Sequence, residues 1–371
     1  MTEKGNEKST GFWRTAWKRY RKSRMGMLAL AFLGLLAAIA FFAPMIANDE
    51  PIVCRMEYTS ADGATTNELY FPGVQETLRQ LPWIGPALFS APPPFSRMDF
   101  KFKKHFKPGR DWAIMPPVPF SPLETSEDRI QGYSGRHWLG TDELGRDVMA
   151  RLIYGTQVSM RVGFISMGIA ALIGLCLGAI AGYFGGWVDM IISRVIEIFM
   201  CFPVFFLILA VLAWFPPRIE NIMIIIGLTR WVGIARLTRG EILRLRELEY
   251  TAAARALGAG PFRIVFRHLL PNALAPAMVS ITFGIAGAIL VESGLSWLGF
   301  GVQAPNPSWG NILRDGYGLM ATTPHMIPPA CAAIFLAVLC FNLVGDTLRD
   351  VIDPRTRGTV SYTHLTLPTK A

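Results

Sequence analysis

The sequence YTAAARALGAGPFRIVFRHLLPNA, residues 250–273, lies between two long apolar runs and indicates how the chain is organised. Its alanines and Leu257 favour a helix with one face of small side chains that can enter a groove. Gly258 and Gly260 then end this helix, and Pro271 limits the segment before the next apolar run. We therefore predict a basic loop that offers a docking face at a membrane surface. The alternative is an ordinary surface helix.

The composition indicates an integral membrane protein. The 371 residues are 51% hydrophobic and 17% charged, with a mean hydropathy of +0.35. The apolar residues form blocks close to the roughly 20 residues that cross a bilayer as a helix. We predict an all-α protein with six spans, at 27–47, 158–183, 195–215, 221–237, 272–296 and 326–345. The fourth is the weakest, because Arg230 and Arg236 interrupt it, and without it the count would be five.

The basic residues predict the orientation of these spans. They cluster in residues 14–24, before the first span, and in residues 236–267, between spans four and five. Short loops rich in Lys and Arg remain in the cytoplasm, so we expect both segments and both termini there. The net charge of +9 then follows from this topology and from anionic lipid, without a nucleic-acid partner.

The chain divides into five parts on this reading. We expect an amphipathic cytoplasmic helix within residues 1–26, an uncleaved anchor at 27–47, an exterior insertion at 48–157, a membrane core at 158–355 and a disordered tail at 356–371. Proline is dense in the insertion, which predicts an irregular cap with a short β element near residues 68–72. The cap could be a lid or a contact surface for a soluble partner. The tail end, 361–371, lacks regular patterning, as a non-native extension would.

A second motif, HWLGTDELGRD at residues 137–147, follows the insertion. Thr141 or Asp142 could cap a short helix, and Asp147 can pair with Arg151 at the i, i+4 spacing. His137 and the acidic residues could also suggest a metal or acid–base site. Their spacing matches no calcium loop and no zinc pattern, so we expect no metal there.

These two motifs resemble those of one transporter family. The second is similar to the H-x-L-G-T-D-x-x-G-R-D signature of the C-type permease subunit of dipeptide, oligopeptide and nickel ABC importers. Its residues here are Gly140, Thr141, Asp142, Gly145, Arg146 and Asp147. The first resembles the EAA loop of ABC importer permeases, with Ala252 in place of the acidic residue. The resemblance assigns ATPase coupling to Ala252, Ala253, Ala254, Leu257, Gly258, Leu270 and Pro271.

The runs at 292–310 and 341–355 extend the resemblance, and residues 46–51 with the long insertion resemble the Yej-type subgroup, which is linked to peptides and peptide-like antibiotics. The resemblance implies the six-helix, type I importer (MetI-like) permease fold in a bacterial inner membrane. It also implies partners: a B-type permease, two cytoplasmic ATPases and an extracytoplasmic binding protein. No phosphate-binding loop occurs in this chain, so ATP would be used by the partners and no cofactor would bind here. Peptide is the expected substrate; nickel or another solute is the alternative.

Charged residues inside the predicted spans need separate explanations. Glu292 interrupts an apolar run, so we expect it to face the translocation path or a partner, or else to reach the exterior interface. Arg194 and Glu197 can pair locally on one helix. A secondary transporter would need internal repeats and clustered intramembrane carboxylates, and a membrane enzyme would need a catalytic constellation. The sequence shows neither.

Overall fold

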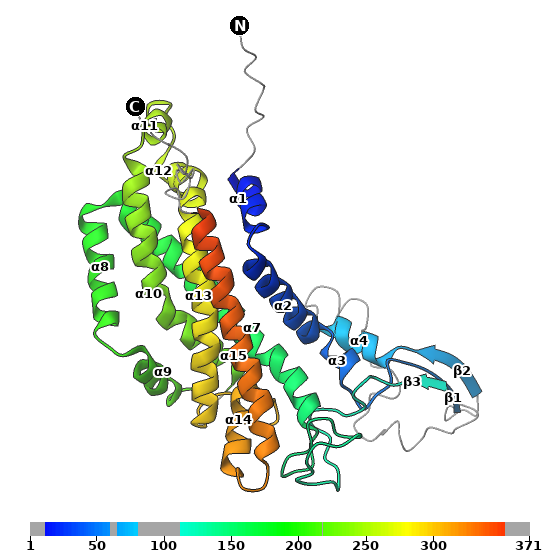
Figure 1. Cartoon of the computed structure of the whole chain (residues 1–371). Coiled ribbons are helices and arrows are strands. Elements are labelled where there is room, and N and C mark those ends of the chain that lie inside the picture. The colour runs from blue at the N-terminus through cyan, green and yellow to red at the C-terminus, as the bar shows by residue number, and fades with distance from the viewer. Residues whose placement is uncertain (1–11, 60–64, 81–111, 217, 353–371) are drawn as a thin grey trace, which may run out of the picture.

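The structure is a computed structural model that describes residues 12–59, 65–80, 112–216 and 218–352. It is a bundle of long helices with a small sheet at one end (Figure 1). Within the described ranges, five helical segments are long and apolar enough to cross a membrane. They are α2 (Arg24–Phe41), α7 (Val148–Phe184), α10 (Ile219–Arg246), the segment Pro261–Trp297 that ends in α13 (Leu270–Trp297), and the segment Pro324–Ile352 that ends in α15 (Ile327–Ile352).

The third predicted span is broken. Residues 195–215 fall on two helices, α8 (Gly186–Met200) and α9 (Val204–Leu212), whose axes differ by 84°. Pro203 explains the break, because proline lacks a backbone N–H and disfavours helical backbone at the preceding residue. The predicted count of six holds when this bent pair is taken as one span.

The span that was weakest in the sequence is a continuous helix. α10 runs past both arginines that interrupt it, and its apolar window is the most buried of the five. The Arg230 side chain remains inside because its Nη2 donates to the Gly287 carbonyl on α13 at 3.1 Å.

Small residues bring α7 and α10 into close contact. A Cβ added to Gly174 would lie 2.8 Å from the Trp231 carbonyl, and one added to Gly178 would lie 2.4 Å from the Ala235 carbonyl. Such stripes of glycine are the usual means of close helix packing in membranes. Gly163 faces α13 in the same way. The largest apolar core therefore forms where α7, α10 and α13 meet.

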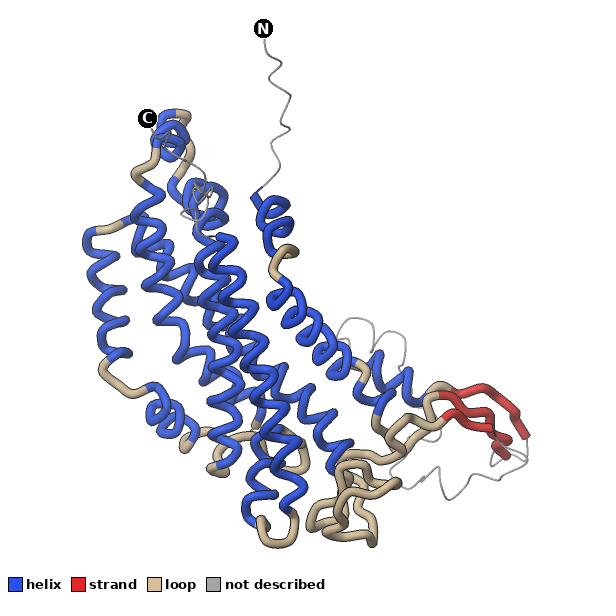
Figure 2. The backbone as a smooth tube through the Cα atoms, in the orientation of Figure 1, coloured by secondary structure: helices blue, strands red, loops and turns tan. Residues whose placement is uncertain are grey.

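One end of the bundle, the sheet end, carries the insertion. Two short helices, α3 (Ala43–Ile46) and α4 (Pro72–Arg79), lead to an antiparallel sheet of order β2-β1-β3, seen in red in Figure 2. The strands are β1 (Val53–Thr59), β2 (Thr65–Tyr70) and β3 (Trp112–Ile114). The predicted β element near 68–72 is confirmed as part of β2, while residues 81–111 of the predicted cap lie outside the described residues. α14 (Trp309–Gly318) and the 3-10 turn η2 (Pro324–Met326) also lie at this end.

The opposite end, the loop end, carries the segment between α10 and α13 together with α1 (Phe12–Tyr20) (Figure 1). That segment contains α11 (Glu249–Ala256), α12 (Pro261–Arg263) and the π-helical turn η1 (Ile264–Leu269). A separate apolar cluster lies beneath it, which we call the loop core. Its buried members are Ala179, Ile242, Leu245, Ile264, Val265, Leu269 and Ala273.

Candidate functional site

The loop end presents a helical tip that is held in place from beneath. Thr251 is completely buried, and its hydroxyl donates to the Leu245 carbonyl at 3.0 Å, which fixes the turn from α10 into α11. Ala254 and Ala259 pack on the loop core. Thr251 was not singled out in the sequence, because its partner lies on the preceding helix.

α11 ends in a Schellman turn. The Ala259 N–H donates to the Ala254 carbonyl at 3.0 Å, and the Gly258 N–H donates to the Arg255 carbonyl at 2.9 Å. Gly258 has a φ of +78°, which favours glycine, and a Cβ there would meet nothing within 4 Å. The glycine is therefore required by backbone conformation, and the space around it is open.

The structure divides the seven predicted coupling residues into two groups. Exposed residues form the tip and the segment after it: Ala252, Ala253, Leu257, Gly258 and Pro271. Ala254 and Leu270 are half-buried and pack on the loop core. Leu257 is 88% exposed, which is costly for a large apolar side chain in water. The tip therefore has the character of a surface that a partner covers.

The HWLGTDELGRD motif builds the sheet end of α7. Gly140 and Gly145 have φ values of +78° and +74°, and added Cβ atoms would lie 2.4 Å from the Gln131 carbonyl and 2.1 Å from the Ser126 carbonyl. Between these turns, the Thr141 side chain is buried, donating to the Asp128 carbonyl and accepting from the Gln131 N–H at 2.9 Å. Both glycines and the threonine are thus needed by the local backbone.

The acidic residues of the motif have different partners from those expected. Asp147 caps α7, because its Oδ1 accepts from the Ala150 N–H at 2.7 Å and its Oδ2 lies 2.8 Å from His137 Nδ1. The prediction that Thr141 or Asp142 is the cap was wrong, and so was the prediction of an Asp147–Arg151 pair. Both oxygens of Asp147 are used in these contacts, and Arg151 has other carboxylate partners.

Arg151 instead joins an ion-pair cluster. Asp142 Oδ2 accepts from Arg146 Nε at 2.7 Å and from Arg151 Nη1 at 2.6 Å, while Arg151 Nη2 donates to Asp315 of α14 at 2.8 Å. Asp142 and Arg151 are almost fully buried. The predicted signature residues are therefore brought together, and they tie α7 to α14. The role of Asp315 was missed, because it lies far away in the sequence.

Glu292 lies inside the chain. It is fully buried on α13, where its carboxylate accepts from the Ser296 hydroxyl at 2.7 Å and from the Ser159 hydroxyl of α7 at 3.3 Å. Ser296 in turn accepts from the Val302 N–H at 3.0 Å. The side chain thus faces neither a surface of this chain nor the exterior interface, in contrast to both expectations. It connects α7, α13 and the loop that leads to α14.

Comparison with known proteins decides the family. Residues 174–358 match the family described as "Binding-protein-dependent transport system inner membrane component". Residues 11–62 match "N-terminal TM domain of oligopeptide transport permease C". Relatives of 30% identity or more align over nearly the whole chain. The chain belongs to this binding-protein-dependent permease family.

Several relatives of the permease are named as transport-system permeases. "Dipeptide transport system permease protein DppC" of Alkalihalophilus pseudofirmus is 42% identical over 64% of this chain and 81% of its own length. "Oligopeptide transport system permease protein OppC" of Bacillus subtilis is 30% identical over 96% and 93%. "Peptidoglycan transport system permease protein YejE" of Agrobacterium fabrum is 32% identical over 91% and 92%. A solved structure of the inward-facing MetNI methionine ABC transporter aligns at 21% identity, covering 55% of this chain and 97% of its own, with a TM-score of 0.44.

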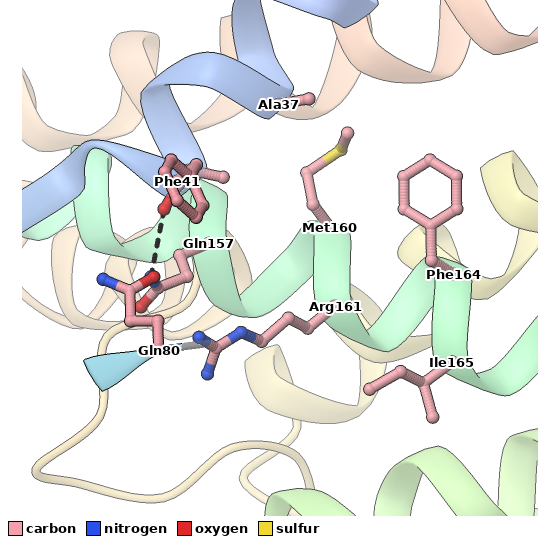
Figure 3. A pocket seen from close by; sticks show the side chains of 9 residues that line it. Ala37, Phe41, Gln80, Gln157, Met160, Arg161, Phe164 and Ile165 are labelled. Carbon is pink, nitrogen blue, oxygen red and sulfur yellow. Dashed lines mark hydrogen bonds between the residues drawn. The ribbon is translucent and has the colours of Figure 1, made fainter. Parts of the chain in front are cut away.

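A groove of about 330 Å³ opens on the permease between α2 and α7, near the sheet end. Gln157 of α7 closes one end, donating to the Ala40 carbonyl at 3.0 Å and to Gln80 Oε1 at 2.6 Å. Figure 3 shows the Arg161 side chain extending toward Gln80, whereas Phe164 lies away from this polar end. Arg161 thus directs its charge to the end of the span, as long basic side chains do near an interface.

Proposed function

We propose that this chain is one of two permease subunits of an ATP-driven importer of peptides. The family and the names of its relatives support a permease for peptides. The chain would form half of the path and pair with a B-type permease. Peptide would arrive on an extracytoplasmic binding protein, in a bacterial inner membrane. The alternative cargo, nickel, has no specific support among the described residues.

We place the loop end in the cytoplasm, with both chain termini on that side. Arginines are dense in the last turn of α10 and in the following loop, as the positive-inside rule requires of a cytoplasmic segment. α1 and the end of α15 lie at the same end of the bundle (Figure 1). The sheet end, with the insertion, then faces the binding protein.

In this proposal two cytoplasmic ATPases use the ATP, and this chain binds no cofactor. The supporting observation from the sequence is the lack of a phosphate-binding loop. One ATPase would receive the tip of α11 in a surface groove. Because the loop core anchors the tip to α7 and α10, closure of the ATPases would move these helices as a rigid body.

The observation that carries the proposal is the exposed Leu257 on a rigid turn. Full burial of a leucine contributes about 2 kcal/mol, or roughly 30-fold in affinity. We expect Leu257→Ser to weaken ATPase association by about this factor while the chain folds normally, because the side chain touches little within its own subunit. Gly258→Glu should disrupt both the turn and the contact.

The test is co-purification of the chain with a tagged ATPase, together with peptide uptake by the whole complex. Gly318→Glu is the matched control, since Gly318 is also exposed with open space around it but lies at the sheet end. Loss of the ATPase from Leu257→Ser and Gly258→Glu, but not from Gly318→Glu, supports the coupling site. If Leu257→Ser and Gly258→Glu both retained the ATPase and full uptake, the coupling assignment would be wrong. Peptide transport by the chain alone would overturn the importer proposal itself.

A further inference from the structure

In the proposed arrangement the break between α8 and α9 lies inside the membrane, because it falls within the predicted third span. The backbone leaves the helix at Cys201–Pro203, and all three residues are exposed in the permease. Non-helical backbone at this depth is tolerated only where protein buries it or where it lines a water-filled cavity. This face of α8 and α9 is therefore unsuited to hydrocarbon.

Exposed charges lie on the same face. Arg194 and Glu197 form an ion pair at 2.5 Å, and their side chains are 73% and 57% exposed. At 1.5 Å per residue they lie about 12 and 16 Å from the start of α8 at Gly186. The hydrocarbon core is about 30 Å thick, so in a span that enters it at Gly186 the pair lies near its middle. Charged side chains at that depth face a bundle interior or a water-filled cavity.

α10 completes the polar surface. Ser193, Ile196, Glu197 and Met200 of α8 and Arg236 and Arg239 of α10 line a recess of about 430 Å³. Arg239 is neutralised by Asp189, to which its Nη2 donates at 2.6 Å. Arg236 is exposed, and its Nη1 lies 3.4 Å from the Met200 sulfur; among the described residues no carboxylate pairs with it.

These charges differ from Arg161. Arg161 extends toward Gln80 at the sheet end, where water is near (Figure 3). Arg194 and Glu197 instead pair with each other in the second half of α8. Of the three charged residues that line the recess, Glu197 is paired with Arg194 and Arg239 with Asp189, which leaves the positive charge of Arg236. The group that this recess can neutralise is an anion, and a peptide offers one in its C-terminal carboxylate.

We propose that this α8–α10 face is one wall of the water-filled translocation path, and that Arg236 binds the C-terminal carboxylate of a passing peptide. The carboxylate assignment rests on the proposed function; the water-filled wall would hold for any hydrophilic cargo. A lipid-facing or partner-covered surface is the competing outcome.

The wall can be tested with native thiols. Two single-cysteine chains keep either Cys201, at the break, or Cys331, which is exposed on α15 beside Phe335; the other four cysteines become alanine. In the purified complex, whose peptide uptake is confirmed first, a charged methanethiosulfonate should modify Cys201 at least about tenfold faster than Cys331, since it reacts with thiolates in water. Transported peptide should slow the reaction. A Cys201 as unreactive as Cys331, in a complex that transports, would overturn the wall and leave the proposed function intact.

The carboxylate site is tested with Arg236→Gln and Arg236→Lys. We expect Arg236→Gln to raise the half-saturating concentration of a peptide with a free C-terminus by about tenfold, with little change for its C-terminal amide, and Arg236→Lys to restore part of the loss. Each variant is compared with the parent complex for the same peptide. Any preference of the binding protein for one of the two peptides therefore cancels. Arg218→Gln, an exposed arginine outside the recess, is the control. An equal effect on both peptides, or none, would overturn the Arg236 assignment. Absence of peptide uptake by the parent complex would instead contradict the proposed function.

Discussion

Arg151 donates from Nη1 to the Asp142 carboxylate at 2.6 Å, and both side chains are almost completely buried. The second nitrogen of the same guanidinium, Nη2, bonds to Asp315 of α14 at 2.8 Å. One arginine thus joins the turn at residues 140–142, the start of α7 and α14. The HWLGTDELGRD motif thus forms a structural joint between α7 and α14, which we call the Arg151 joint.

Removal of the central carboxylate should therefore destabilise the fold. Asp142→Ala leaves the buried Arg151 with only the partly exposed Asp315, and breaking a buried ion pair costs about 3–5 kcal/mol. We expect a clear fall in the thermal denaturation midpoint of the purified chain. Glu143→Ala, at the exposed neighbouring position, should change it little. Equal midpoints for the two variants would contradict the role of the joint.

A second prediction concerns Glu292. Glu292→Leu leaves the buried hydroxyls of Ser159 and Ser296 without their acceptor, at a cost of about 1–3 kcal/mol for each unsatisfied group. We expect the variant to insert and to denature at lower temperature, whereas Glu292→Gln, which can still accept, should lose less. Glu247→Leu, on an exposed side chain, is the control. Unchanged stability of Glu292→Leu with reduced uptake would favour a direct contact with the path.

The third prediction is a pH dependence at the sheet end. Burial, followed by the nearby carboxylates of Asp49 and Glu76, raises the pKa of Glu50 from 4.5 to about 6, against a smaller lowering by Arg79. Between pH 4.5 and about 6, the folded chain thus binds more protons than the unfolded chain. The free energy of unfolding therefore falls as pH rises through this window, and the ionised Glu50 destabilises the fold fully above about pH 6.

Glu50→Gln should accordingly stabilise the permease at pH 7.5 and much less at pH 5. The gain is at most about 2 kcal/mol and is reduced by solvent screening, because the side chain is partly exposed. Thermal denaturation at the two pH values measures it, with Glu143→Gln as the control. The same gain at both pH values would show that the carboxylate is not the cause.

A fourth prediction tests the proposed orientation in intact cells. In a chain without its exposed native cysteines, Glu143→Cys at the sheet end should react with a membrane-impermeant thiol reagent added outside. Ala256→Cys at the loop end should react only after permeabilisation. Both positions are exposed in the subunit. Strong outside labelling of Ala256→Cys would reverse the topology.

Most of the spans could be predicted from the sequence, because blocks of apolar residues have the length of a bilayer. The exact ends could not: α7 begins at Val148, ten residues before the predicted span at 158, because Asp147 caps it there. The 84° bend at Pro203 also escaped prediction, because hydropathy over a window reports the length of an apolar run and not the direction of its helix axis.

The turn at the tip of α11 was predicted from local signals, small residues followed by Gly258, because these determine a local turn. The partners of Arg151 and Glu292 were not, because Asp315 and Ser159 lie 164 and 133 residues away. Hydropathy and short spacings contain no information about such distant pairings. They become visible only when the helices are packed.

The glycine stripe on α7 has a mechanical consequence. Gly174 and Gly178 lie against the α10 backbone, and a Cβ added to Gly182 would lie 2.8 Å from the Arg239 carbonyl. Neither helix can slide or rotate past the other without a steric clash. The two helices therefore behave as one rigid unit. A displacement of the tip of α11 would therefore move α7 and α10 together. The Arg151 joint would transmit this movement to α14 at the sheet end.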